Sequence, residues 1–161
     1  MRKLLVIKTT TPNSLSKWHK IRNPFRIAFN FILIFVSKYL PSLGLKRFLL
    51  RLTGMKIEKN VSIATGVMFD FFWPELIELK ENCLIGLNST VLSHEFLISE
   101  YRTGKTIIGK NVLIGANSTV LAGVEIKENA VIGAMSLVNS VVPANSFFVG
   151  VPARQKQIKT L

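Results

Sequence analysis

The chain has 161 residues, of which 48% are hydrophobic and 19% are charged, and its formal net charge is +12 at pH 7. This composition excludes a disordered chain and supplies enough apolar residues for one domain with a hydrophobic core. The single cysteine, Cys83, excludes an intrachain disulfide framework and is compatible with a reducing compartment. The apolar run after Arg2 and Lys3 is too short for a secretory signal. We therefore expect a cytoplasmic protein.

The positive charge is concentrated in the first third of the chain. Residues 1–59 hold 13 Lys and Arg and one acid, whereas residues 60–161 hold eight basic and eight acidic residues. A nucleic-acid-binding domain would need a basic stripe with aromatic residues on its folded surface, and the neutral remainder argues against one. We expect a basic N-terminal segment, residues 1–54, that differs in role from the rest.

Within this segment, residues 24–54 predict two amphipathic helices. The stretch from Phe25 to Tyr39 is apolar on most faces, and Pro41 ends it. A second apolar face follows at Leu45, Phe48, Leu49 and Leu52. No apolar run here approaches the length of about 20 residues that a bilayer-spanning helix needs. Two placements remain open: the helices lie on an anionic membrane surface, or they cap the open end of the following domain.

The remainder of the chain is dominated by a repeat of six residues. Aliphatic residues recur at this spacing at Ile108, Ile114, Val120, Ile126, Ile132 and Val138. Two positions before each stands a small or β-branched residue: Thr106, Val112, Ser118, Val124, Ala130 and Ser136. An α-helix repeats apolar residues every 3.6 positions and a strand every two, so neither explains a period of six. It indicates a solenoid of triangular cross-section, with three hexads in each 18-residue coil and both residue sets pointing inward.

The repeat also runs upstream, with two interruptions. The same spacing links Ile57, Ile63 and Phe69, and then Leu79, Ile85 and Val91. The aromatic stretch 69–74 is the first interruption, and residues 94–105 are the second and predict an external loop. We expect about four coils and a partial fifth within residues 55–150, followed by a basic tail at 151–161. Cys83, two positions before Ile85, is expected to fill the core and not to act as a nucleophile.

The hexads, one histidine before a projecting loop, two further coils and the ending Gly150-Val151-Pro152-Ala153-Arg154 together resemble the hexapeptide-repeat acyltransferases. The nearest group is the maltose, galactoside and capsular-polysaccharide O-acetyltransferases, and the resemblance covers residues 55–159. It implies an all-β, left-handed parallel β-helix, here with an N-terminal helical segment. It also implies a homotrimer with active sites between subunits and a loop, 94–105, that reaches toward a neighbouring subunit.

The resemblance assigns the chemistry to His94, which matches the family's catalytic histidine. A sugar hydroxyl is a poor nucleophile, and a neutral imidazole can take its proton as it attacks the thioester of acetyl-CoA. No metal is expected. Asp70 falls where the family places residues that contact the acceptor, and Glu95, beside the histidine, is assigned to the same substrate side. Which acid orients the imidazole remains open; Glu95 and Glu100 are the nearest in sequence.

The resemblance also implies a set of cofactor contacts. Ala116 and Ala134 match small residues beside the pantetheine arm, and Asn139 matches a polar contact near them. Arg154 matches a residue that meets a CoA phosphate, and Lys156 and Lys159 are candidates to add positive charge there. For these two lysines the alternative is an ordinary basic C-terminus.

Three other functions were weighed against O-acetyl transfer. A carbonic anhydrase of this fold would need three zinc-binding histidines, whereas the chain has two and only His94 lies in the repeat. A serine or sugar N-acyltransferase of the same fold remains an alternative, as does a non-catalytic scaffold at a membrane surface. His19 lies in the basic segment outside the repeat and is expected at the surface. The sequence leaves the identity of the acceptor open.

Overall fold

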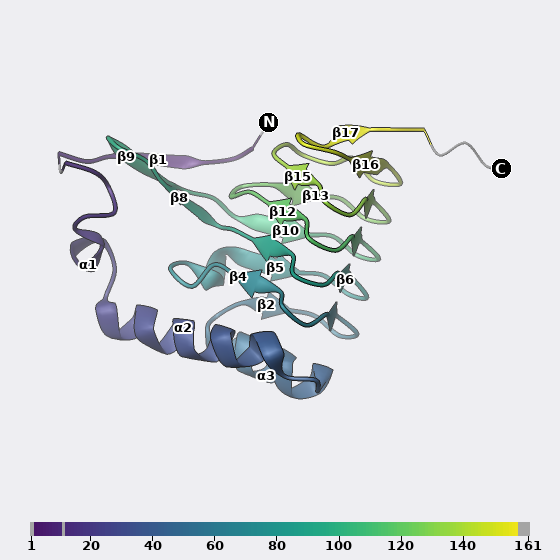
Figure 1. Ribbon diagram of the computed structural model, residues 1–161, viewed down its shortest axis with the longest axis horizontal. Helices are drawn as coiled ribbons and strands as arrows, with labels where there is room; N and C mark the ends of the chain where they lie inside the picture. Colours follow the sequence, from purple (N-terminus) through teal and green to yellow (C-terminus); the bar gives the residue numbers. More distant parts are fainter. Residues whose placement is uncertain (1, 11, 158–161) are drawn as a thin grey trace.

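Residues 55–157 form a stack of triangular coils in the computed structural model (Figure 1), which describes residues 2–10 and 12–157. Each coil gives one short strand to each of three parallel sheets. The strands of the first two coils are β2 (Lys56–Ile57), β3 (Ser62–Ile63), β4 (Met68–Phe69), β5 (Ile77–Leu79), β6 (Leu84–Ile85) and β7 (Thr90–Val91). Those of the next two are β10 (Thr106–Ile108), β11 (Leu113–Ile114), β12 (Thr119–Val120), β13 (Glu125–Ile126), β14 (Val131–Ile132) and β15 (Leu137–Val138). A partial fifth coil ends in the antiparallel pair β16 (Phe147–Val149) and β17 (Arg154–Gln155).

The core follows the predicted period of six. Ile108 pairs with Ile126 and Val120 pairs with Val138, so identical positions of successive coils stack on one another. Every residue of the two sets predicted to point inward between Thr106 and Val138 is at most 2% exposed. Since each coil buries its apolar edge only against its neighbours, the stack provides the stability of the domain. The predicted solenoid and its inward positions are confirmed.

Asparagines form the turns at one corner of the stack. Most of the non-glycine residues with positive φ in the described chain are asparagines, a residue that tolerates this region. Their side chains also bond to one another along the stack, from Asn82 to Asn111 at 2.9 Å, then to Asn129 and to Asn145 at 3.0 Å each. This ladder fixes the register of the coils at that corner.

The first third of the chain contains both predicted helices and two elements that the sequence analysis does not foresee. The predicted helices are α2 (Pro24–Tyr39) and α3 (Leu43–Leu52), and they are confirmed. They are preceded by β1 (Leu5–Lys8) and the short helix α1 (Trp18–Ile21). In Figure 1 the chain begins beside the last coils, runs along the stack and places α2 and α3 beneath the first coil. No helix in the described ranges has the length and hydrophobicity needed to cross a membrane.

The predicted external loop is a β-hairpin. Residues 94–105 contain β8 (His94–Phe96) and β9 (Glu100–Thr103), which pair antiparallel. Strand β1 adds to the outer side of β9, also antiparallel, and completes a three-stranded sheet. The N-terminal segment therefore contacts the stack in two places: β1 pairs with this hairpin, and α2 and α3 lie beneath the first coil.

Helix α3 caps the open end of the stack through its cations. Backbone N–H groups of each coil donate to carbonyls of the following coil, as Ser62 does to Cys83, so the carbonyls of the first coil point toward the open end. Lys46 Nζ donates to the carbonyls of Ile63 (3.0 Å) and Ala64 (3.1 Å). Two arginines act in the same way: Arg47 donates to Val61 O and Arg51 to Ile57 O. Of the two placements left open by the sequence, the helices adopt the cap, and the α3 cations serve it because the groups they meet are carbonyl acceptors. The open end also presents a donor, since the N–H of Gly66 donates to the carbonyl of Lys38 at 2.9 Å.

Candidate active site

His94 lies where the chain leaves the second coil. It follows β7 and begins β8, the first strand of the projecting hairpin. In the coil below, Asp70 follows β4 at the same corner of the stack. Because Phe69 pairs with Val91 in the parallel sheet, the residues that follow these two strands are brought together. The sheet register therefore sets Asp70 directly against the histidine.

The Asp70 carboxylate is enclosed, with no exposed side-chain surface. Its Oδ1 accepts hydrogen bonds from the backbone N–H groups of Phe72 (2.8 Å) and Trp73 (3.2 Å). Its Oδ2 accepts from the backbone N–H groups of Ser93 and His94, both at 2.9 Å, and is bonded to Nδ1 of the His94 ring. This placement corrects the expectation that Asp70 contacts the acceptor, because an enclosed carboxylate bonded through both oxygens to the protein has no free oxygen for a ligand.

The ionisation of Asp70 determines the tautomer of His94. Burial alone would raise the pKa of this carboxyl, but the hydrogen bond and charge interaction with His94 and the backbone donors of Ser93 and Trp73 outweigh it. The pKa of Asp70 therefore lies below its ordinary value of 3.8. An ionised carboxylate only accepts hydrogen bonds, so Nδ1 of His94 carries the proton and Nε2 keeps a free lone pair. This arrangement can take a proton from a bound group.

An aromatic cluster encloses the His94 imidazole. The ring centroids of Phe72 and Phe96 are 4.8 Å from it and that of Trp73 is 5.1 Å away, while Tyr101 stacks on Trp73 at 5.8 Å. Phe72 and Trp73 belong to the first interruption of the repeat, and Phe96 and Tyr101 belong to the hairpin. Both interruptions therefore converge on the histidine, and they leave its side chain 14% exposed.

The other two acids considered as partners of His94 point elsewhere. In the described part of the chain, neither Glu95 nor Glu100 is bonded to the imidazole. Glu95 forms an ion pair with the guanidinium of Arg2, and Glu100 accepts from Nε of Arg102 at 2.7 Å. Glu95 thereby links the N-terminal segment with the hairpin that carries His94, and its contact with the substrate stays a prediction.

Two of the predicted cofactor residues share one cavity. Asn139 and Arg154, together with Arg2, Leu4 and Ser140, line a space of about 640 Å³. It lies at the corner that follows β15, on the same edge of the stack as His94 two coils earlier. Arg2 is paired with Glu95, so Arg154 is the guanidinium of this lining that suits an anionic ligand.

The remaining cofactor residues lie apart from that cavity. Ala116 and Ala134 occupy the corner that precedes β12 and β15, at the opposite edge of the β4–β7–β12–β15 sheet. They are neighbours there, since the N–H of Met135 donates to the carbonyl of Ala116 at 2.9 Å. Lys156 lines a different space of about 550 Å³, and Lys159 lies outside the described residues. Among the described residues, the predicted cofactor contacts of one chain therefore fall in three separate places and not in a single site.

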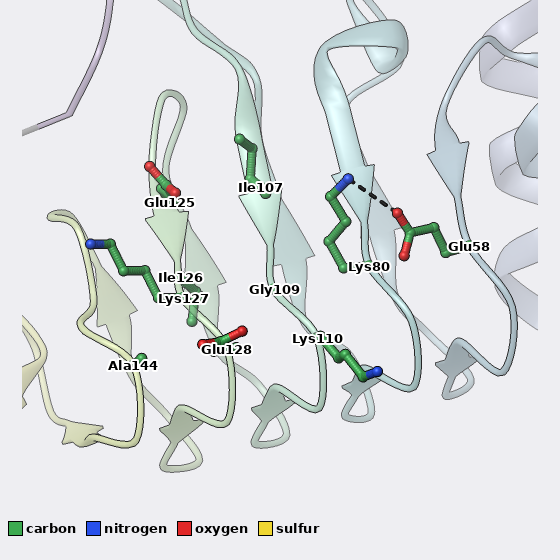
Figure 2. A pocket seen from close by; sticks show the side chains of 10 residues that line it. All are labelled: Glu58, Lys80, Ile107, Gly109, Lys110, Glu125, Ile126, Lys127, Glu128 and Ala144. Carbon is green, nitrogen blue, oxygen red and sulfur yellow. Dashed lines mark hydrogen bonds and ion pairs between the residues drawn. The ribbon is translucent and has the colours of Figure 1, made fainter.

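A further cavity of about 360 Å³ lies on the outer face of the sheet that contains β5, β10 and β13 (Figure 2). Its lining is mainly charged, and Lys80 pairs with Glu58 across adjacent coils at 3.1 Å. None of the residues predicted for catalysis or for cofactor binding lines it. We attribute its ion pairs to the outer surface of the stack and not to the active site.

The free thiol is also excluded from the chemistry. Cys83 has no exposed surface, and burial raises the pKa of its thiol to about 12. A thiol in this state is protonated at cellular pH and is a poor nucleophile. The predicted core position of Cys83 is confirmed, and His19 is exposed as expected.

Two features of this region are not predicted from the sequence: Asp70 as the partner of His94, and Arg2 as a lining residue of the cavity with Asn139 and Arg154. For Asp70 a signal existed: aligning Phe69 with Val91 as equivalent hexad positions sets Asp70 beneath the residues just before the histidine. For Arg2 no repeat or motif gave a signal, because its position depends on β1 pairing with β9. The aromatic cluster was visible only as two breaks in the repeat.

Comparison with known proteins agrees with this architecture. Residues 105–140 match the family model described as bacterial transferase hexapeptide (six repeats). YvoF of Bacillus subtilis (strain 168), provisionally named an acetyltransferase, is 44% identical over 142 residues, which are 86% of this chain and 83% of YvoF. SAS0727 of Staphylococcus aureus (strain MSSA476), with the same provisional name, is 39% identical over 160 residues, 99% of each chain. A solved galactoside acetyltransferase in complex with coenzyme A has a TM-score of 0.63 at 21% identity and covers 83% of this chain and 80% of its own. The last likeness identifies the stack of coils as the left-handed β-helix of hexapeptide-repeat proteins.

Proposed function

The chain belongs to the hexapeptide-repeat acetyltransferases, and we propose that it moves the acetyl group of acetyl-CoA to a hydroxyl group of a sugar or polysaccharide precursor. The observation that carries this proposal is the hydrogen bond between the enclosed Asp70 carboxylate and Nδ1 of His94. It leaves Nε2 of a partly exposed imidazole free to act as a general base.

In the proposed reaction His94 acts directly on the acceptor. Nε2 takes the hydroxyl proton while the acceptor oxygen attacks the thioester carbonyl and forms the new C–O bond. The C–S bond then breaks, and the proton passes from Nε2 to the departing sulfur, which gives CoA thiol and an acetyl ester. Asp70 acts as a positioning residue: its negative charge stabilises the imidazolium that exists between the two transfers.

The pairing of His94 with an ionised acid favours a hydroxyl acceptor. An alcohol stays protonated at neutral pH, so its attack depends on a base that gains strength as it accepts the proton. The Asp70 carboxylate accepts hydrogen bonds from four backbone N–H groups and from the ring Nδ1–H. It is therefore preorganised to stabilise the imidazolium that forms when Nε2 takes the hydroxyl proton. We therefore prefer O-acetylation to N-acetylation for this enzyme.

The donor site is proposed to lie between subunits of a homotrimer. Asn139 and Arg154 are at one edge of the β4–β7–β12–β15 sheet, and Ala116 and Ala134 are at the other. A CoA molecule held between two chains can meet the first pair on one subunit and the second pair on its neighbour. This supports acetyl-CoA as the donor, with its phosphates near Arg154, and an assembly in which the hairpin carrying His94 faces an adjacent chain.

Acetyl-CoA is an intracellular metabolite, so we place the enzyme in the cytoplasm. The basic N-terminal segment further supports a peripheral position at the inner face of the membrane, where polysaccharide precursors on lipid carriers would be accessible. The surface that would make this contact is formed by exposed apolar residues of α2 and α3.

The test is an acetyl-transfer assay on the purified full chain with acetyl-CoA and a panel of sugars. Release of free thiol should depend on the acceptor, and the product should gain one acetyl group by mass spectrometry. Mild alkali should remove that group, because an ester is hydrolysed where an amide is not. An alkali-stable product would replace O-transfer with N-transfer, and absence of acceptor-dependent thiol release across the panel would reject the proposal.

A further inference from the structure

The outer face of α2 is apolar along its whole length. Phe25, Phe29, Ile32 and Val36 recur at helical spacing, and they are 86%, 43%, 58% and 46% exposed. The opposite face of the helix, with Ile27 and Ile34, is buried against the stack. Exposed apolar surface of this extent on a single face marks an interaction site. The helix therefore has two partners, and the described chain supplies one of them.

Helix α3 extends this apolar face beside α2. Its outward residues Leu45, Phe48 and Leu52 are 47%, 55% and 45% exposed, while Lys46 and Leu50 on its inner side are buried. The two helices pack against each other and lie together at the base of the stack (Figure 1). The exposed residues of both helices, Phe25, Phe29, Ile32, Val36, Leu45, Phe48 and Leu52, are called the basal face below.

A row of aromatic rings connects this region with the catalytic histidine. Successive ring centroids are 5.7 Å apart from Tyr39 to Phe35, 5.8 Å to Phe31, 5.4 Å to Phe71, 5.1 Å to Phe72 and 4.8 Å to His94. Tyr39, Phe35 and Phe31 are 59%, 49% and 42% exposed, whereas Phe72 is buried. The row places the exposed rings of α2 and the imidazole on one side of the stack, joined through Phe71 and the buried Phe72.

The charged side chains that α2 and α3 carry are all cations; Lys46, Arg47 and Arg51 donate to the first coil, and Arg26 and Lys38 lie on α2. Residues 1–57 contain no Asp or Glu, so every charged side chain near α2 and α3 within that part of the sequence is a cation. Arg26 lies 5.5 Å from the Phe29 ring centroid, and Lys38 Nζ lies 5.5 Å from that of Tyr39. A second copy of the chain would bring the same cations to a shared contact and repel. An anionic lipid surface complements both the apolar residues and the positive charge.

We propose that the basal face docks on an anionic lipid bilayer, and that the acceptor is a hydroxyl-bearing headgroup carried on a lipid whose chain lies along the aromatic row. The choice of acceptor rests on the acetyl transfer proposed above. Docking brings the hydroxyl to His94 from the membrane side, while acetyl-CoA enters from solvent at the opposite end of the stack, near Arg154.

Docking is tested by co-sedimentation of the full chain with vesicles of phosphatidylcholine alone or mixed with phosphatidylglycerol, at low and high salt. Binding should need the anionic lipid and weaken with salt. The double change Phe29→Ser with Phe48→Ser should weaken it roughly tenfold or more, because two ring side chains no longer enter the interface. Leu5→Ser is the matched control, since Leu5 is 63% exposed on β1, away from the basal face, and should leave binding unchanged.

The acceptor is tested with a methyl glycoside and a dodecyl glycoside of one sugar, assayed in anionic vesicles. Wild type should favour the dodecyl glycoside in kcat/KM, and Phe31→Ser should reduce that ratio about tenfold, whereas Leu5→Ser should not. Equal use of both glycosides would overturn the lipid acceptor while leaving acetyl transfer intact, and acetylation of neither would overturn the proposed function itself. If the double variant binds vesicles as well as wild type does, docking through the basal face is overturned. If the double variant has a smaller particle mass than wild type by light scattering, the basal face is assigned to contact with another copy of the chain.

Discussion

The ring Nδ1 of His94 and Oδ2 of Asp70 are hydrogen-bonded between adjacent coils, although 24 residues separate them in the sequence. The same carboxylate oxygen accepts the backbone N–H of His94, so Asp70 holds both the main chain and the ring of the histidine. The pairing of β4 with β7 keeps the two residues at one corner of the stack.

Replacing His94 with Ala should lower turnover by about two to four orders of magnitude, which is the usual contribution of a general base. The KM for acetyl-CoA should change little, since the predicted phosphate contacts are elsewhere. The measurement is steady-state thiol release with a saturating acceptor.

The control for this variant is Cys83→Ala, which removes the one thiol of the chain from a buried core position. It should keep near-normal turnover. Loss of activity in a folded Cys83→Ala variant would indicate a covalent route through the thiol, and near-normal turnover in His94→Ala would reject the proposed base.

Replacing Asp70 with Asn should lower kcat about a hundredfold or more, because a neutral amide neither fixes the ring tautomer nor stabilises the imidazolium. The KM for acetyl-CoA should stay within a few-fold of wild type, as expected for a positioning residue that no substrate touches. A variant that lost acetyl-CoA affinity with kcat intact would instead assign Asp70 to substrate binding.

The stability of the protein should depend on pH through Asp70. Its pKa is lowered in the folded state, so ionised Asp70 stabilises the fold above the ordinary value of 3.8, and this contribution is lost as pH falls through the lower folded pKa. The difference in free energy of unfolding between wild type and Asp70→Asn should thus be largest near neutral pH and should shrink below pH 3.8. Denaturant titrations across that range measure it, and a difference that grows in acid would contradict the assignment.

The protein should be a trimer in solution. On the outer face of the β6–β11–β14 sheet, Leu84 and Leu113 are paired in register and are 44% and 40% exposed. We expect a neighbouring subunit to cover these apolar side chains. Three chains of 18.0 kDa would give about 54 kDa in light scattering at micromolar concentration. A fully active monomer would refute both the assembly and the donor site between subunits.

Replacing Lys46 with Ala should destabilise the protein by about 2–4 kcal/mol, because two backbone carbonyls lose their donor and the buried stem leaves a cavity. Burial lowers the pKa of this lysine, and its Nζ donates to two carbonyls of the first coil. Chemical denaturation checks the value, with exposed Lys17→Ala as a control expected within about 0.5 kcal/mol of wild type. Equal stability of the two variants would show that α3 is not needed as a cap.

The sequence by itself determined the solenoid, its inward residues, the two helices and the position of the histidine before the hairpin. These features are local or strictly periodic: a residue such as Ile114 is buried because the same hexad pattern recurs one coil above it. A repeated local rule needs no knowledge of the remaining chain, which is why the core could be predicted one residue at a time.

The tertiary structure decided the partner of His94, the place of Arg2 and the role of the α3 cations. For the first, the hexad register sets Asp70 beneath the residues before His94, but only the folded chain turns its carboxylate onto the ring Nδ1. The second depends on β1 pairing with a hairpin more than 90 residues away, as in the contact of Arg2 with Glu95. The third arises because the strand carbonyls of each coil accept from the coil before it, so only the finished stack leaves first-coil carbonyls at its open end that Lys46, Arg47 and Arg51 can satisfy.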